Sequence, residues 1–479
     1  MFNFNNLGIM LHKYEHMTLV ALLFCFPFLL GVDYKTHQAS QLHDITRIHP
    51  VAIVALVITV AFMLKLPRDK AILPFFIMIM LVSMNQVIAI FSLDFFIYRI
   101  LIIAGLIRLT ICSEFYPQTK NKIDKTIFLL VISICVVYIL QWQTVSAIIY
   151  RAGYALDIIG SYILFRSLIR DIEDIDRLIK TFVFISLIIA TIMIIEQITQ
   201  INITSFFGGV SKYTGIRDGK IRSEAALGHP ILAGTFGAIM LPLFVYLWTN
   251  QRQSKSYAIL GIFSSTIIAF TSSSSGPILT YIAAMFALFL YPLRQYIRVI
   301  KWGLLFSVVS LHLYMKAPVW SLLDRVSVFG SSTAYHRFVL VDQFIRRFDE
   351  WWLLGIKSTE QWNELLQMWD ITNQFVRIGI DGGFLSLFLF ISAIFFCFNR
   401  IGCGIRALTN DKMVFLFWAL GAMFFSNITA FMGVSYYGQM LFIWILTISI
   451  ISSLSDLSNH NWKSNQETIA VNTCNSLVN

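Results

Sequence analysis

Arginine and lysine residues gather in two polar stretches of this chain, residues 200–228 and residues 316–381. The first stretch ends in Lys212, Arg217, Lys220 and Arg222. The second holds Lys316, Arg325, Arg337, Arg346, Arg347, Lys357 and Arg377. An arginine guanidinium presents a planar fork of donors that matches a phosphate, so these groups predict binding of an anionic ligand. The alternative is that the cations only contact anionic lipid headgroups.

A helix start is expected beside the first stretch. Pro230 suits the first turn of the apolar segment that follows, because the N–H that proline lacks has no partner there. Arg222 then lies one or two turns before the helix N-terminus. A helix N-terminus next to an arginine fork is a suitable seat for an oxyanion or a pyrophosphate.

The composition excludes a soluble domain. The chain has 479 residues, of which 57% are hydrophobic and only 13% charged, so we predict an all-α polytopic membrane protein. The net charge is +10, but the cations lie in short clusters between apolar segments, so nucleic acid is not an expected partner. The spacing of His37, His43 and His49 fits no zinc pattern. We expect no metal and no other cofactor.

The apolar segments predict about 12 to 14 transmembrane helices. They lie near 17–33, 50–65, 71–91, 95–112, 127–145, 147–166, 179–199, 229–249, 257–272, 277–293, 301–315, 382–399, 412–431 and 437–455. With a cytoplasmic N-terminus, the inner loops are rich in Lys and Arg and the short outer loops contain none, as is usual. Both termini are then cytoplasmic, and the two cationic stretches face outward. An anionic ligand would explain cations on that face.

This topology divides the chain into six parts. They are N-terminal transmembrane helices (1–199), an outer cationic loop (200–228), transmembrane helices (229–315), a large, partly helical outer loop (316–381), C-terminal transmembrane helices (382–455) and a polar cytoplasmic tail (456–479).

Other charged residues give weaker signals. Asp174-Ile175-Asp176 spells the D-x-D of metal-dependent glycosyltransferases, but it falls in a predicted cytoplasmic segment. A solvated helix start, with acids at the positive end of the dipole, explains it better. Arg151 and Asp157 lie within apolar segments, where charges suggest function. Six residues apart, they occupy different helix faces, so we expect no direct pair.

Four motifs, in order over residues 200–400, resemble those of the O-antigen ligase and polysaccharide polymerase superfamily. Residues 222–234, from Arg222 through His229-Pro230 to Gly234, resemble its R-x-x-G-x-x-x-H-P-x-x-x-G signature, with Ala225 at the first Gly. Residues 272–276 (SSSSG) stand where the family has a Ser/Arg/Gly turn, without the Arg. Two further motifs belong to the family's large outer loop. Arg337 with residues 351–356 (WWLLGI) resembles the first, and residues 372–375 (TNQF) with 382–385 (GGFL) resemble the second.

The resemblance implies a GT-C-like membrane glycosyltransferase. Such enzymes take a glycan from undecaprenyl pyrophosphate at the outer face of the bacterial inner membrane and transfer it to an acceptor glycan, without a metal and with inversion. By resemblance, Arg222 and Arg337 would hold the pyrophosphate and stabilise its developing charge. Arg217, His229, Asn373, Arg377 and Arg347 are further candidates for substrate binding. The expected partners are the lipid-linked glycan, the acceptor and membrane lipids, with a chain-length regulator as a further candidate.

One residue of the closing motif differs from that of the family's ligases and bears on whether the chain is a polymerase or a ligase. Ligases of this family carry a His before the Asn of the closing motif, where this chain has Thr372. Threonine cannot act as a base near neutral pH, so a polymerase is favoured over an O-antigen ligase that transfers to lipid A core. Candidates for any general base are Asp370, Glu224, Asp381 and His336. A lipid-linked oligosaccharide flippase is the alternative from another class, but no internal repeat is visible.

Overall fold

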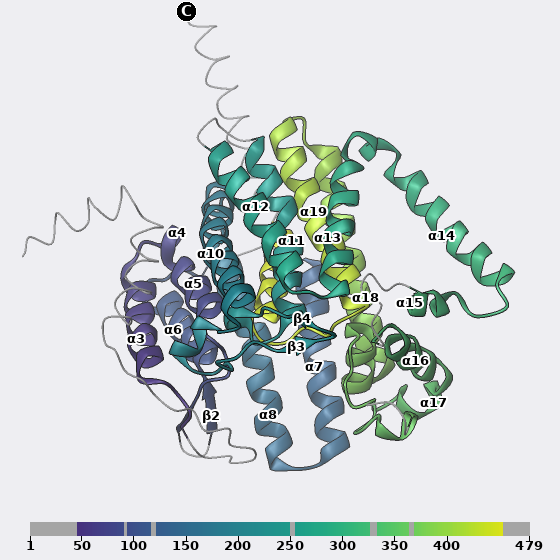
Figure 1. Cartoon of the computed structure of the whole chain (residues 1–479), viewed down its shortest axis with the longest axis horizontal. Helices are drawn as coiled ribbons and strands as arrows, with labels where there is room; N and C mark the ends of the chain where they lie inside the picture. Colours follow the sequence, from purple (N-terminus) through teal and green to yellow (C-terminus); the bar gives the residue numbers. More distant parts are fainter. Residues whose placement is uncertain are drawn as a thin grey trace, which may run out of the picture.

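The computed structural model describes residues 46–90, 93–115, 121–249, 254–325, 333–363 and 368–453. The predicted span at 17–33, His37, His43 and the predicted tail lie outside the described residues. Within them the chain is mostly helical with almost no sheet (Figure 1). The described part contains seven helices long and apolar enough to cross a membrane. This confirms a helical protein with several candidate spans.

The N-terminal half runs through helices up to α10. Its elements are α3 (Pro50–Lys65), α4 (Arg68–Ala71), α5 (Leu73–Leu81), β1 (Val87–Ile90), β2 (Leu93–Phe96), α6 (Ile97–Ile111), α7 (Lys122–Trp142), α8 (Val145–Ala155), a π-helical turn η1 (Leu156–Gly160), α9 (Ser161–Leu168) and α10 (Ile172–Thr199). The predicted boundaries of 50–65 agree with α3. The prediction of one continuous helix at 71–91 is wrong, because α5 ends at Leu81 and β1 pairs antiparallel with β2. The β-branched residues of β1 favour this pleated strand.

The C-terminal half begins with an irregular segment and continues through long helices. Its elements are η2 (Ile203–Phe207), β3 (Ile216–Arg217), β4 (Lys220–Ile221), η3 (Ala225–Leu227), α11 (Pro230–Trp248), α12 (Ser254–Thr271), α13 (Ser275–Phe289), η4 (Tyr291–Tyr296), α14 (Ile297–Tyr314), η5 (Val319–Ser321), α15 (Leu322–Arg325), α16 (Thr333–Arg346), α17 (Phe348–Trp351), η6 (Glu360–Trp362), α18 (Gln374–Ala407), α19 (Asp411–Phe431) and a last helix, Gln439–Ser453. As expected, α11 begins at Pro230.

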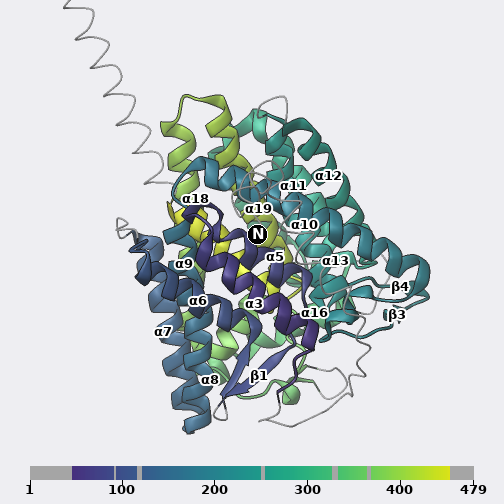
Figure 2. The ribbon, with the colours of Figure 1, turned by 90° about the vertical axis from the view of Figure 1, so that its left-hand side faces the viewer.

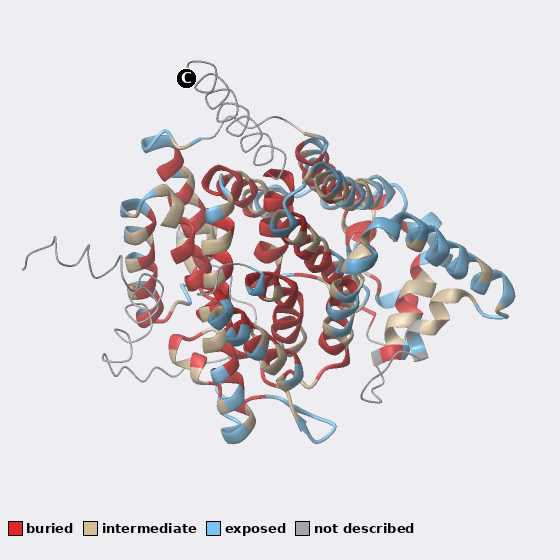
Figure 3. Cartoon of the chain, turned by 90° about the horizontal axis from the view of Figure 1, so that it is seen from above, coloured by how far each residue is buried: buried red, intermediate tan, exposed pale blue. Residues whose placement is uncertain are grey.

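Helix α11 forms the centre of the bundle and packs against α10, α12, α13 and α19. Its apolar side chains are buried on nearly all sides, which is the pattern of an interior helix. Helix α14 is the opposite case: none of its residues is buried, and it extends away from the bundle (Figure 3). The protein core therefore holds α11, whereas the apolar side chains of α14 are free of protein contact over most of their surface.

The D-x-D segment is a helix start, as predicted, but it is not solvated. Asp171 and Asp174 form a reciprocal capping box at the N-terminus of α10. Asp174 is only 6% exposed and accepts from Arg68 Nη1 at 2.7 Å. The acid therefore joins α10 to the start of α4.

Candidate functional site

The segment 200–228 folds back over the end of α10. Glu196, in the last turn of that helix, is fully buried. Its carboxylate accepts from the backbone N–H groups of Glu224 (2.9 Å) and Ala225 (2.8 Å) and from the Thr214 hydroxyl (3.3 Å). A buried carboxylate is stable only when such donors satisfy it. Glu196 thus fixes the residues that follow Arg222, a role that the sequence analysis missed.

The β3–β4 hairpin contains Arg217, at the end of β3, and is followed directly by Arg222. Its turn residues, Asp218 and Gly219, both have positive φ, as expected for a tight two-residue hairpin turn. Figures 1 and 2 place this hairpin beside α13. The hairpin therefore carries Arg217 outward while the chain returns Arg222 toward the bundle.

Arg222 contacts the N-terminus of α13. Its Nη2 donates to the hydroxyl of Ser274, the residue that precedes the helix, at 2.8 Å. The backbone N–H of the next residue, Ser223, donates to the carbonyl of Thr271 at the end of α12. The serine turn at 272–276 does join two helices, as predicted, and Arg222 lies against it.

Arg337 reaches the same helix end from α16. A Cβ added at Gly276 would lie 3.9 Å from Arg337 Nη2, and one added at Gly433 would lie 3.4 Å from its Cζ. The guanidinium therefore lies against two glycines, one in the first turn of α13 and one after α19. Its Nε is buried and has no hydrogen-bond partner among the described residues. Such an unsatisfied donor predicts a missing acceptor.

The electrostatics also favour an anion. Burial lowers the pKa of the Arg222 guanidinium, and the nearby Arg217 guanidinium lowers it further, while Glu224 and Asp218 oppose this effect. Burial and Arg217 also lower the pKa of Arg337, and Asp370 opposes this effect. Three cations thus share one region with the positive end of the α13 dipole. A bound phosphate or pyrophosphate would relieve their mutual repulsion.

His229 lies at the edge of this cluster. It precedes α11, and its Nδ1 is buried without a hydrogen-bond partner in the described part of the chain. Its ring forms a T-shaped contact with the ring of Tyr437, at a centroid distance of 6.0 Å. Burial lowers its pKa, Arg222 lowers it further, and Asp370 opposes both. The imidazole is therefore neutral at neutral pH and can either donate or accept a hydrogen bond.

Glu224 is a second acid at the site. Burial and the neighbouring Glu196 raise its pKa to about 7, against the effect of Arg222. A carboxylic acid with such a pKa can take up or release a proton near neutral pH. Among the base candidates, Glu224 raises the pKa of Arg222, and Asp370 raises the pKa values of His229 and Arg337.

Asn373 caps the N-terminus of α18. It is 2% exposed, and its side-chain oxygen accepts from the N–H groups of Phe375 and Val376 at the start of α18. Its Nδ2 lies 3.5 Å from the Met432 carbonyl. Asn373 therefore caps α18, and its predicted role in substrate binding stays a prediction. The Thr372 hydroxyl beside it is buried without a partner among the described residues.

Two predicted site residues lie away from the cluster. Arg347 pairs with Glu350 at 2.9 Å, three residues further along the chain. Arg377 pairs with Asp381 at 3.1 Å, four residues further along α18. Among the described residues, neither guanidinium has a hydrogen bond or ion pair with a residue of the Arg222 and Arg337 cluster, and their predicted roles in substrate binding stay predictions.

At three glycine positions of the motifs the backbone has a positive φ. Ala225, at the first Gly of the signature, has φ +48°, in a region that glycine enters easily. Gly355 and Gly383 also have positive φ, and a Cβ at either would meet a backbone carbonyl oxygen, at 1.9 Å and 2.6 Å respectively. These glycines let the backbones of 352–356 and 380–384 approach closely: the Ile356 N–H donates to the Ile380 carbonyl, and the Phe384 N–H donates to the Trp352 carbonyl.

No protein-family model matches this chain, and no curated protein matches it significantly. Within the described ranges, no group of three or more His, Cys, Asp or Glu side chains could hold a metal ion. What the site offers is a set of cations at a helix N-terminus, with a neutral histidine and an acid of raised pKa beside them.

Proposed function

We propose that this protein is a membrane glycosyltransferase that takes a glycan from a polyprenyl pyrophosphate and adds it to a second lipid-linked glycan, as a polysaccharide polymerase does. The observation that carries the proposal is the meeting of Arg222 and Arg337 at the N-terminus of α13. The two come from segments more than a hundred residues apart, and Arg337 keeps a buried donor without an acceptor.

The arrangement suits a pyrophosphate leaving group. As the glycosidic bond breaks, negative charge grows on the pyrophosphate oxygens. Donors fixed before the reaction stabilise that charge without reorganising. Arg222 is held by its hydrogen bond to Ser274, and Arg337 lies against Gly276 and Gly433 with its Nε free to donate to a phosphate oxygen. We infer that Glu224 accepts the proton of the acceptor hydroxyl, because it lies two residues after Arg222 and its raised pKa lets it exchange a proton near neutral pH.

The setting is a GT-C-like polytopic fold with about 12 to 14 crossings of a bacterial inner membrane. Both termini are cytoplasmic, and the segments 200–228 and 316–381 are outside. The signature glycine positions with positive φ support the superfamily resemblance. Thr372 in place of a basic histidine favours the polymerase over the ligase.

Deletion of the gene tests this assignment. A polymerase deletion leaves single repeat units on the surface anchor, which a polysaccharide gel separates from long chains. Long chains retained on the lipid carrier would instead indicate a ligase. An unchanged polymer ladder, in a strain without a second copy, would refute both activities.

A further inference from the structure

The turn between α19 and the last helix, residues 432–438, is held against the start of α18. The Ser435 hydroxyl donates to the Ile371 carbonyl at 2.9 Å. The backbone N–H of Tyr436 donates to Gln374 Oε1 at 2.6 Å. These two hydrogen bonds join the turn to the segment that follows the large loop, although the two are about sixty residues apart in the sequence.

The same turn also contacts the candidate site. Gly433 lies against Arg337, since a Cβ added at this glycine would lie 3.4 Å from the guanidinium Cζ. Just after the turn, Gln439 Nε2 donates to the Ala226 carbonyl at 2.9 Å, in the segment that follows Arg222. Contacts near both of its ends therefore fix the turn relative to the two arginines.

Two adjacent tyrosines of this turn have opposite surroundings. Tyr436 is 7% exposed, and its hydroxyl donates to Asn427 Oδ1 at 3.0 Å. Tyr437 is 50% exposed, and its ring forms the T-shaped contact with the ring of His229. The turn thus buries one ring as an anchor and presents the other ring beside the candidate site.

The acids of the site also act on Tyr437. Partial burial, and then the charges of Asp370 and Glu224, raise the pKa of its phenol to about 12. The ring is therefore uncharged over the neutral range. Asp370 also acts on the pKa values of His229 and Arg337. An uncharged aromatic ring thus shares this region with the cations and with both acids.

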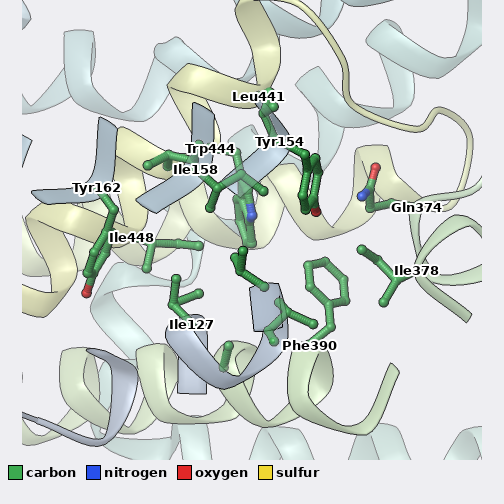
Figure 4. A pocket seen from close by; sticks show the side chains of 14 residues that line it. Ile127, Tyr154, Ile158, Tyr162, Gln374, Ile378, Phe390, Leu441, Trp444 and Ile448 are labelled. Carbon is green, nitrogen blue, oxygen red and sulfur yellow. The ribbon is translucent and has the colours of Figure 1, made fainter. Parts of the chain in front are cut away.

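The apolar pocket on the other side of Gln374 offers no room for a sugar (Figure 4). Gln374 lines this pocket together with side chains of α7, α18 and the last helix. Its volume is about 50 Å³, whereas ligand pockets commonly measure about 300–1,000 Å³. The exposed part of Tyr437 is therefore the surface of this turn that a sugar can reach.

We propose that Tyr437 is a platform for the sugar that is joined to the pyrophosphate, an inference that rests on the proposed function. A tyrosine offers an apolar ring face and a polar hydroxyl, which suit the C–H groups and the hydroxyls of a sugar. With the pyrophosphate against Arg222 and Arg337, the adjoining sugar would lie beside the turn that Gly433 and Tyr437 share. The platform would let the protein bind the glycosylated carrier more tightly than the bare carrier that it releases.

The test measures binding to purified full-length protein in detergent. The two probes are undecaprenyl pyrophosphate and the same lipid carrying one N-acetylglucosamine. We expect the wild type to bind the glycosylated lipid about three- to tenfold more tightly, as one aromatic contact allows. Tyr437→Leu should abolish this ratio and leave the Kd of the bare lipid unchanged, whereas Tyr437→Phe should keep the ratio.

The matched control is Tyr314→Leu, which changes an 89% exposed tyrosine at the end of α14 and should keep the wild-type ratio. Equal affinity of the wild type for the two lipids would overturn the platform, and so would loss of the ratio in Tyr437→Phe. An equal loss of both lipids in Tyr437→Leu would also overturn it, because a structural role or a contact with the lipid chain predicts that result.

Arg337→Ala separates this inference from the proposed function. It should weaken binding of both lipids, because both carry the pyrophosphate. If Arg337→Ala binds both lipids as the wild type does, the pyrophosphate role of the arginine fails, while a sugar preference that depends on Tyr437 would still support the platform. If the wild type binds neither lipid, the proposed function and the platform both fail.

Discussion

Glu224 should make the folded protein less stable as the pH rises. Its pKa is raised from an ordinary 4.5 to about 7, mainly by burial. Between these values the unfolded chain ionises the carboxyl while the folded protein keeps the proton, so stability falls with rising pH. The shift corresponds to about 3 kcal/mol at 1.36 kcal/mol per unit, and partial solvation of the side chain reduces this to about 1–2 kcal/mol.

Glu224→Gln removes this penalty. Thermal unfolding of the purified protein should show the variant equal to the wild type near pH 4, and more stable by about 1–2 kcal/mol near pH 8.5. The matched control is Asp218→Asn, which neutralises an exposed acid in the hairpin turn and should keep the wild-type pH dependence. If Glu224→Gln loses stability with pH as steeply as the wild type does, the burial of this carboxyl has been misjudged.

Three further predictions follow from the backbone and the topology. Gly355→Ala should destabilise the protein by at least about 2 kcal/mol, since its φ is +64° and a Cβ would meet a carbonyl oxygen. The control Gly402→Ala should leave stability unchanged, because a Cβ there would meet nothing within 4 Å. Equal unfolding temperatures of the two variants would contradict the prediction. Asn373→Ala should lose about 1 kcal/mol of helix capping in the same assay, with Asn373→Asp close to wild type. Cysteines at Ser211 and Gln361, both exposed, should react with a membrane-impermeant thiol reagent on intact cells, and protection of both would reverse the orientation.

Local features of the fold could be read from the sequence. The start of α11 at Pro230 and the acidic start of α10 depend on residues within one helical turn. The failure at 71–91 has a physical reason, because an apolar run rich in β-branched residues suits a buried strand as well as a helix. Length did not decide between them, since residues 73–90, from the start of α5 to the end of β1, are as many as one span needs.

The candidate site was less predictable than the helices. Arg222 and Arg337 were recognised by motif, but their meeting at α13 depends on contacts between distant segments, which spacing does not reveal. By contrast, the sequence shows a local partner for Arg347 and for Arg377. Each has an acid three or four residues later, and in the structure each pairs with that acid.

The central claim is that Arg222 and Arg337 together hold a pyrophosphate during glycan transfer. The most direct measurement incubates purified protein with a lipid-pyrophosphate-linked repeat unit and follows glycan length and release of the free lipid pyrophosphate. The wild type should lengthen the glycan. Arg337→Ala should lose nearly all of this activity, and Arg337→Lys most of it, because Lys lacks the planar two-point contact with phosphate. Lengthening by folded Arg337→Ala at the wild-type rate would contradict the account.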